Sequence, residues 1–209
     1  MAYRETPRMR ARKAATRQNI LESTNALVAE GGFGNASVAR VAERAEVAIG
    51  SVYRHFDSKS DLFAEVFRNA TEQEVSKVAE ALSGEGNAST VLAESLRVFA
   101  RRAIRAPTMA WALIAEPVDP VVEAERLRYR QAYAELFEQA LERGIREGLF
   151  ARQNARLSSA ALVGAIAESL IGPLSPAAED LTGDSANDLI EAIVRFCMNA
   201  VRPEGGNTP

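Results

Sequence analysis

Cysteine and histidine are nearly absent, with Cys197 and His55 as the single representatives. One cysteine cannot form an internal disulfide, and one cysteine with one histidine cannot complete a zinc site. No Ser-His or Cys-His arrangement can form away from His55, and no glycine loop that would cradle a phosphate follows a strand. We therefore expect no enzyme, no catalytic residue, no metal and no cofactor. We interpret Cys197 as a small buried apolar side chain.

Long apolar runs are also missing. No stretch of 18 consecutive apolar residues occurs, and residues 1–18 lack the apolar core of a secretory signal. With 47% hydrophobic and 25% charged residues, the composition is ordinary for a soluble globular protein. We predict a cytoplasmic protein without a membrane partner.

Positive charge is scarce overall, since the net charge is −3, but it is concentrated at one end. Residues 1–60 contain ten Lys or Arg against six Asp or Glu, whereas residues 61–209 contain fifteen against twenty-two. Six of the ten precede the first apolar stripe, namely Arg4, Arg8, Arg10, Arg12, Lys13 and Arg17. This pattern is typical of a basic arm on an acidic body, and a solvated tail would have the same composition.

Helical periodicity recurs along the whole chain, and strand-type alternation does not. The pattern predicts an all-α fold of nine helices. The first helix is expected at about 12–30, the second after a cap at Ser37, and the third from about Ala48. The fourth follows a capping box at 58–61 and ends at about residue 82. The fifth to seventh are expected at 90–105, 107–115 and 120–147, the eighth after a cap at Asn154, and the ninth over a stripe from Ile190 to Val201.

Two short helical segments follow each other at residues 37–56 with almost no linker. Two helices joined by three or four residues form a helix-turn-helix, in which the second helix lies in the DNA major groove. A helical hairpin in a bundle would show the same spacing. Together with the basic arm, the spacing leaves DNA binding and bundle packing equally open.

Over about residues 12–66 the sequence contains Gly31-Gly32-Phe33, Ser37, Val41-Ala42, Ala45, Val47, Gly50-Ser51-Val52-Tyr53, His55-Phe56, Ser58-Lys59 and Asp61-Leu62 in this order. Together these residues resemble the N-terminal domain of the TetR family of transcriptional repressors. The remainder is similar more loosely, in its helix order and in "EPVDP" followed by "AERLRYR". The resemblance implies a homodimer that binds a palindromic DNA operator and releases it when a small-molecule effector enters the C-terminal domain.

The resemblance also implies a division of the chain into segments. We expect a basic flexible arm at 1–11, a helix-turn-helix domain at 12–60, a ligand-binding and dimerisation domain at 61–202, and a disordered tail at 203–209. The long fourth helix runs from the DNA unit into the body, so we expect it to act as the lever between the two.

Three residues depart from the family pattern. Glu46 stands where the turn usually has glycine, so a left-handed backbone there would cost about 1 kcal/mol. Ala48 stands where a Ser or Thr usually caps the recognition helix. Arg54 adds a long cation near the DNA.

Roles at the DNA follow from the position of each residue on the third helix. Its first residues, Ala48, Ile49, Gly50 and Ser51, are expected to face base edges. Residues at its far end are suited to phosphates, and cations on its flank could take either role. The complete set of predicted DNA-binding residues is Ser37, Arg40, Ala48, Ile49, Gly50, Ser51, Tyr53, Arg54, His55 and Lys59. A packed aromatic for Tyr53, and a solvated position for His55 and the arginines, remain open as alternatives.

The effector site is predicted from apolar and phenolic side chains on helices five to seven. The candidates are Phe99, Met109, Trp111, Ile114, Tyr129, Tyr133 and Phe137, and ordinary core packing remains open for each of them. Trp111 lies in the short helix between two prolines, so we expect its position to respond to the ligand. We interpret the nearby carboxylates of Glu116, Asp119, Glu123 and Glu125 as a helix cap and a charged helix start, not as catalytic groups.

The eighth and ninth helices are the predicted homodimer contact. The eighth is poor in charge from Leu157 to Ile171, and its small residues would permit close approach of a second copy. An alternative class, a helical adaptor that binds protein and does not read DNA, also fits amphipathic helices.

Overall fold

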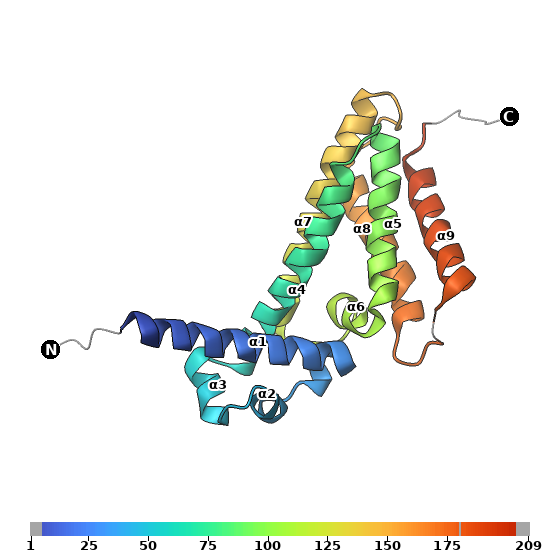
Figure 1. The fold of residues 1–209 in the computed structure, drawn as a ribbon. Helices are drawn as coiled ribbons and strands as arrows, with labels where there is room; N and C mark the ends of the chain where they lie inside the picture. Colours follow the sequence, from blue (N-terminus) through green and yellow to red (C-terminus); the bar gives the residue numbers. More distant parts are fainter. Residues whose placement is uncertain (1–5, 180, 204–209) are drawn as a thin grey trace.

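The computed structural model describes residues 6–179 and 181–203, and within these ranges it contains nine α-helices and no strand (Figure 1). The predicted all-α fold is thereby confirmed. In chain order the helices are α1 (Pro7–Asn35), α2 (Val38–Arg44), α3 (Ile49–His55), α4 (Lys59–Leu82), α5 (Ala88–Arg105), α6 (Pro107–Ile114), α7 (Pro120–Arg146), α8 (Ala155–Leu174) and α9 (Gly183–Val201).

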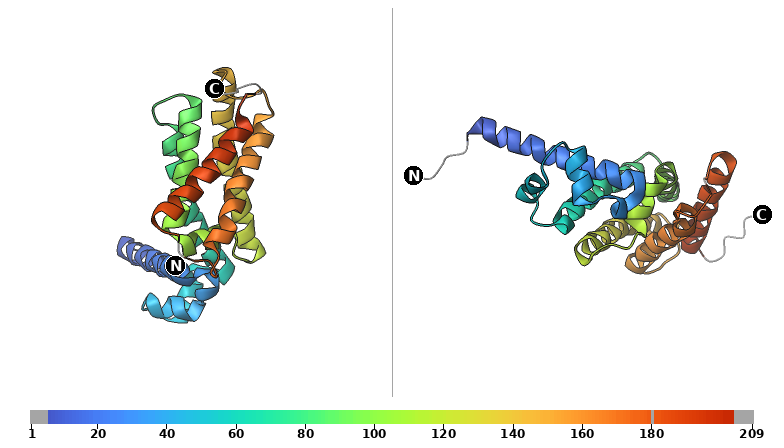
Figure 2. Two further views of the ribbon diagram at one scale, coloured as in Figure 1. Left: turned by 90° about the vertical axis from the view of Figure 1, so that its right-hand side faces the viewer. Right: turned by 90° about the horizontal axis from the view of Figure 1, so that it is seen from below.

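The helices form two parts that α4 connects. Helices α1 to α3 lie together at one end, and the long helices α4, α5, α7, α8 and α9 rise from them, with α6 at the junction (Figure 1). Helix α9 packs on the outer side of α5 and α8 (Figure 2). Helix α6 touches α1, α5 and α8, so it lies where movement of one part would reach the other.

The first helix begins earlier than the sequence predicted. Thr6 accepts a hydrogen bond from the N–H of Met9, and Pro7 occupies the first helical turn, so the helix already starts at Pro7. Residues 7–11 of the expected flexible arm are therefore helical, because a well-capped segment of arginine and alanine extends a helix that the core has already nucleated. Residues 1–5 of that arm, and 204–209 of the expected tail, lie outside the described residues.

Side-chain caps fix most of the other helix starts, as predicted. The Ser58 hydroxyl accepts from the Asp61 N–H at 3.0 Å and donates to the Asp61 carboxylate at 2.7 Å. Asp119 accepts from the N–H groups of the first turn of α7, and Asn154 caps α8. Helix α5 begins two residues before the expected position, because the side-chain Oδ1 of Asn87 accepts from the Thr90 N–H at 3.0 Å.

Two buried clusters hold the described residues together. One unites α1 to α3 with the start of α4 around Ile20, Val28 and Phe33, and the other fills the body around Leu92 and Phe137. Helix α4 contributes its first half to the former and its second half to the latter. The division at residues 60 and 61 stays a prediction, since the helix across it is continuous.

Cys197 belongs to the body cluster. It is a free cysteine and fully buried, which confirms the predicted buried side chain. Burial disfavours the thiolate and raises the pKa of the Cys197 thiol to about 11, so the group acts as an apolar filler.

Candidate nucleic-acid interface

The turn between α2 and α3 has a defined geometry even though it lacks glycine. The Val47 N–H donates to the Ala42 carbonyl at 2.9 Å, and the Glu46 N–H donates to the Glu43 carbonyl at 3.1 Å. These two bonds are the Schellman arrangement, which needs a left-handed residue after the helix. Glu46 supplies it with φ of 53°, as expected from its place in the turn. Such a backbone costs about 1 kcal/mol in a residue other than glycine.

Helix α3 presents an unburied face to solvent. Val52 anchors the helix in the core, whereas Ile49 and Tyr53, one turn apart, are 51% and 52% exposed. No atom lies within 4 Å of the place where a side chain at Gly50 would begin, and no side chain caps the helix at Ala48. The predicted base-reading residues therefore lie on or beside a single open face, with two large apolar side chains that the protein itself leaves uncovered.

The predicted Arg40 and Arg54, and the neighbouring Arg44, have partners within α1 to α3. Arg40 donates to the Asn35 carbonyl at 2.8 Å, and Arg44 pairs with Glu30 at 2.6 Å. Arg54 donates to the Ser51 hydroxyl at 2.8 Å on its own helix. Ser37 caps α2 through the Arg40 N–H at 3.2 Å. Each of these cations is exposed, so a phosphate can compete for it at the surface.

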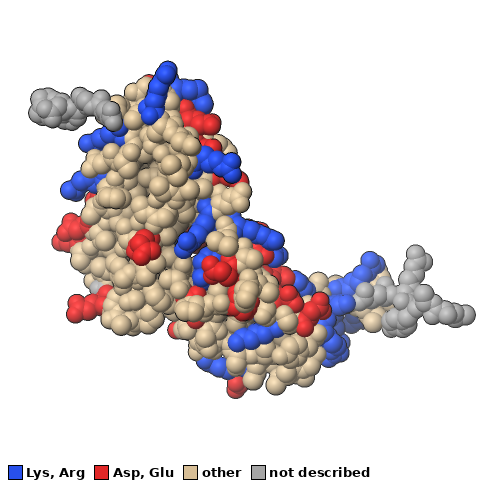
Figure 3. Space-filling model, turned by 180° about the vertical axis from the view of Figure 1, so that it is seen from behind, with Lys and Arg blue, Asp and Glu red and all other residues tan. Residues whose placement is uncertain are grey.

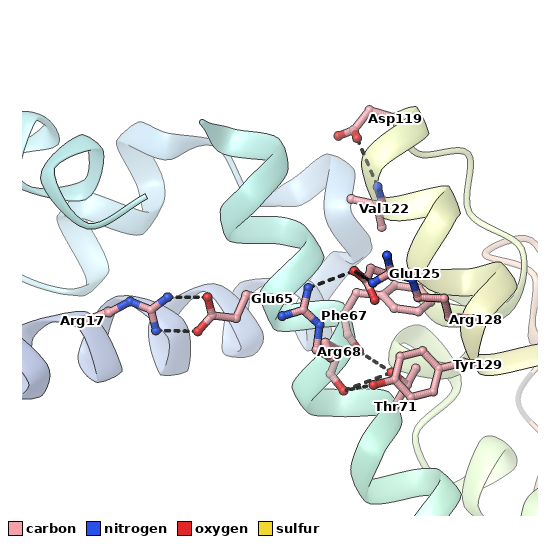
Figure 4. Close-up of polar contacts among 10 residues, drawn as sticks. All are labelled: Arg17, Glu65, Phe67, Arg68, Thr71, Asp119, Val122, Glu125, Arg128 and Tyr129. Atoms are coloured by element: carbon pink, nitrogen blue, oxygen red, sulfur yellow. Dashed lines mark hydrogen bonds and ion pairs between the residues drawn. The ribbon is translucent and has the colours of Figure 1, made fainter. Parts of the chain in front are cut away.

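Basic residues of α1 lie beside the C-terminal end of α3. The Arg17 guanidinium lies 4.7 Å from the centre of the Phe56 ring and pairs with both carboxylate oxygens of Glu65 (Figure 4). In the space-filling view, Lys and Arg side chains gather along the projecting end of α1, whereas basic and acidic side chains are mixed over the body (Figure 3). Basic residues of α1 thus lie close to the end of α3.

The pKa of His55 is affected by this concentration of positive charge. Burial lowers the pKa of its imidazole, and so do the nearby charges of Lys13, Arg17 and Arg54, in that order. Its Nδ1 is buried and, among the described residues, has no hydrogen-bond partner. Neighbouring cations favour the neutral ring, and an anion bound at this place would reverse that preference. The site is therefore electrostatically suited to an anion.

Lys59 lies just beyond α3, at the start of α4. Its ammonium is 4.7 Å from the centre of the Phe63 ring, and the residue is exposed. The aromatic face holds the stem while the charged end remains available to a phosphate.

The body contains a narrow cavity of about 90 Å³ bounded by helices α4 to α8. Five of the seven predicted effector residues line it: Phe99, Met109, Ile114, Tyr129 and Tyr133. Phe137 does not, because its side chain is fully buried in the body core. Trp111 lines a different cavity, of about 560 Å³, between the end of α1, α6 and the segment after α8. The seven residues therefore do not form one site.

Phenolic and charged groups interrupt the apolar wall of the narrow cavity. The Tyr129 hydroxyl donates to the Arg68 carbonyl at 3.1 Å, and burial raises the pKa of Tyr133. Arg102 forms a two-pronged pair with Glu74, with Nη2 to Oε1 at 2.8 Å. Arg130 also lines the cavity, and no hydrogen bond or ion pair is found for it among the described residues. Arg130 is exposed, so its guanidinium is open both to solvent and to a bound anion.

Two residues of the carboxylate cluster have roles that the sequence did not reveal. Glu125 is buried on α7 and accepts from Arg68 at 2.8 Å and from Arg128 at 3.0 Å, which ties α4 to α7 (Figure 4). The hydrogen bond from Arg68 is the main reason that the pKa of Glu125 is lowered. Glu116 binds the end of α1 instead of forming part of a helix start. Buried acids that need a distant partner give no periodic signal.

Arg126 is a further residue that sequence reasoning missed. It is only 7% exposed, lies in the wall of the narrow cavity, and donates to the carbonyls of Leu113 at 3.0 Å and Glu116 at 2.6 Å. Desolvation is the main cause of its lowered pKa. The carbonyl end of a helix carries partial negative charge, so the Arg126 cation stabilises the end of α6.

Comparison with known proteins agrees with this geometry. The family model for bacterial regulatory proteins of the tetR family matches residues 20–66. The chain is 30% identical over 142 residues to the HTH-type transcriptional repressor KstR2 of Rhodococcus jostii, an alignment that covers 66% of this chain and 69% of that protein. It is 48% identical over 46 residues to KstR of the same organism, which is 22% of each chain.

Solved structures share the fold at low sequence identity. FadR from Bacillus subtilis, in complex with stearoyl-CoA, has a TM-score of 0.73 and 19% identity over 88% of this chain and 99% of that one. A TetR family regulator from Agrobacterium tumefaciens has a TM-score of 0.71 and 19% identity over 91% and 99%. With the helix-turn-helix, the nine-helix order and the repressor relatives together, the chain belongs to the TetR family of transcriptional regulators.

Proposed function

We propose that this protein is a ligand-responsive transcriptional repressor that binds a palindromic operator as a homodimer and releases it when a small, largely apolar effector enters the body. The observation that carries the proposal is the open face of α3, where Ile49 and Tyr53 are half exposed next to the cations that surround His55. An uncovered apolar face beside concentrated positive charge suits the methyl groups and phosphates of duplex DNA. The segments 12–60 and 61–202 are then the DNA-binding and effector-binding domains.

Base and phosphate contacts divide along α3. The small or apolar side chains at Ala48, Ile49 and Gly50 suit thymine methyl groups in the major groove, and the Ser51 hydroxyl can bond to almost any base. The Tyr53 hydroxyl, His55 and Lys59 are placed for phosphates, with Arg40 and Arg54 on the flank and Ser37 at the start of α2.

This division predicts two kinds of variant. Tyr53→Phe and Lys59→Ala remove a phosphate partner, so they should weaken binding to all duplexes by a similar factor, roughly three- to tenfold. Ile49→Ala should change which sequence is preferred, because it alters a base-edge contact. The measurement is selection from a random duplex library, followed by gel-shift titration of each variant on the selected operator.

The wild-type protein is the reference for that experiment. Identical preferred sequences for wild type and Ile49→Ala would remove Ile49 from base readout. A wild-type protein that retains no duplex at physiological salt would reject the repressor and favour the helical adaptor.

The homodimer is proposed through α8 and α9. Leu157 and Phe196 are 68% and 65% exposed, although both are large and apolar. Helix α8, Ala155–Leu174, is also long and apolar enough to cross a membrane by length and composition, with 39% of its most apolar part buried. Its outer residues Ala160, Ala161 and Gly164 are exposed and small. A second copy would cover this surface by forming a four-helix bundle.

The effector is proposed to bind in the narrow cavity. Its free space of about 90 Å³ lies below the roughly 300–1,000 Å³ of ordinary ligand pockets. Entry must therefore separate the surrounding helices, which is how binding energy can shift the conformation. The fold relative FadR was solved with stearoyl-CoA, a ligand with an apolar chain and anionic groups. An apolar wall with the exposed cation of Arg130 at its edge supports the same combination here.

An acid and an alcohol of equal chain length test this assignment. Octanoate should bind more tightly than octanol, and Arg130→Gln should weaken octanoate roughly tenfold while leaving octanol unchanged, because only the acid uses the cation. Titration calorimetry measures both ligands. Arg146→Gln is the matched control, since Arg146 lies on the same helix and outside this cavity. Equal affinities for the two ligands in wild type would contradict an anionic effector.

A further inference from the structure

A carboxylate from the body is bound at the end of the first helix. The N–H groups of Phe33 and Gly34 donate to Glu116 Oε2 and Oε1, each at 2.8 Å. Glu116 lies 82 and 83 residues further along the chain, in the segment that joins α6 to α7. Two consecutive backbone donors that converge on one carboxylate form an anion-binding nest.

The backbone before these donors is shaped for close approach. Gly32 has φ of 76°, which favours glycine, and Gly31 also leaves the helical conformation. A side chain at Gly32 would begin 2.5 Å from Glu116 Oε2 and 2.8 Å from Oε1, so the carboxylate occupies the space that any other residue would need. The contact therefore depends on the backbone at Gly32 as well as on the Glu116 carboxylate.

The other side of Glu116 is held by the wall of the narrow cavity. Its N–H donates to the Trp111 carbonyl at 3.0 Å, and its carbonyl accepts from Arg126 Nη2 at 2.6 Å. Arg126 lines that cavity together with Met109 of α6. A continuous series of hydrogen bonds therefore connects the cavity wall, the end of α6 and the end of α1.

We infer that Glu116 is a positioning residue for operator binding: its two bonds to Phe33 and Gly34 hold the DNA unit in the orientation that fits the operator, and effector entry releases the operator by displacing them. This inference rests on the proposed repressor function and names how it is regulated. The connection runs through α6 and α1, beside the α4 lever that the sequence suggested. Glu116 itself touches no DNA.

The test uses wild-type protein and the duplex selected by it from a random library. Trp111 is the single tryptophan, its carbonyl accepts from the Glu116 N–H, and its side chain lines the cavity that also contains Gly32 and Glu116. Operator should therefore change Trp111 emission in wild type. In Glu116→Gln, one acceptor oxygen is replaced by a donor, so operator affinity should fall on the order of tenfold and the emission change should disappear.

Salt dependence separates orientation from lost phosphate contacts. Because Glu116 contacts no phosphate, the slope of log affinity against log salt should be the same in wild type and Glu116→Gln. Glu179→Gln is the matched control, because Glu179 lines the same cavity and binds neither Phe33 nor Gly34. It should leave affinity and emission unchanged. Thermal unfolding of each variant identifies any loss of folded protein.

Gly32→Ala disrupts the same contact from the α1 side, because its Cβ would occupy the place of the Glu116 carboxylate. It should therefore weaken operator binding in the same way while Glu116 is unchanged. If Glu116→Gln fails to fold, the operator affinity of Gly32→Ala tests the inference. Operator affinity equal to wild type in either folded variant overturns the inference while the repressor function stands. A wild-type protein that selects no duplex rejects the repressor function, and the inference with it.

Discussion

Phe196→Asp should convert the dimer into monomers and lower operator affinity roughly 100-fold or more. Phe196 is 65% exposed on α9, and the proposed bundle would bury its ring against a second copy. A carboxylate at the same place would lose its hydration in the interface without gaining a partner. Two linked half-site contacts exceed one by a factor of 10² to 10⁴, so the separated subunit loses that advantage.

Light scattering at micromolar concentration measures the oligomeric state, and gel shift measures the operator affinity. Val121→Asp is the matched control, because Val121 is a 46% exposed apolar residue at the start of α7 and belongs to neither α8 nor α9. It should remain dimeric. If Phe196→Asp also remains dimeric, the contact does not involve the exposed face of α9.

Phe137→Ala should lower the free energy of unfolding by about 3–5 kcal/mol, because a fully buried aromatic ring leaves a cavity that the core cannot close. The Phe137 side chain is 0% exposed in the body core, although its spacing on α7 first suggested an effector contact. Phe99→Ala should be the milder change, since Phe99 is only partly buried and lines the narrow cavity.

Urea unfolding at one fixed protein concentration measures both variants, because dimer stability depends on concentration. Octanoate titration supplies the second readout, and Phe99→Ala should affect it more strongly than Phe137→Ala. A loss of stability below about 1 kcal/mol in Phe137→Ala would place the ring outside a close-packed core.

The helices and their caps could be predicted from the sequence because they depend on near neighbours. Ser58, Asp119 and Asn154 accept from N–H groups two or three residues away, so residue type and spacing are sufficient to find them. The left-handed backbone at Glu46 was expected from the resemblance to the TetR family, whose turn usually has glycine at this position. The start of α1 was wrong because the sequence pattern followed only the apolar stripe and overlooked the cap at Thr6.

The position of an aromatic residue inside the body could not be predicted. Phe99, Trp111 and Phe137 each lie on a predicted helix of the body. Phe99 lines the narrow cavity, Trp111 lines the larger cavity, and Phe137 fills the core. Periodicity shows which face of a helix turns inward, and it does not show whether the opposing helix leaves space there.

What the sequence determined by itself is the order of helices and their caps, since each depends on local spacing. The helix-turn-helix followed from the same spacing together with the resemblance to the TetR family. Only the tertiary structure revealed that Glu116 meets Gly32 and that Arg126 holds the end of α6. In the sequence, Glu116 resembles any acid before a charged helix. Its role arises because α6 packs against α1, which brings a carboxylate to two backbone donors more than 80 residues away. A contact of this kind depends on the packing of whole helices, and no local pattern encodes it.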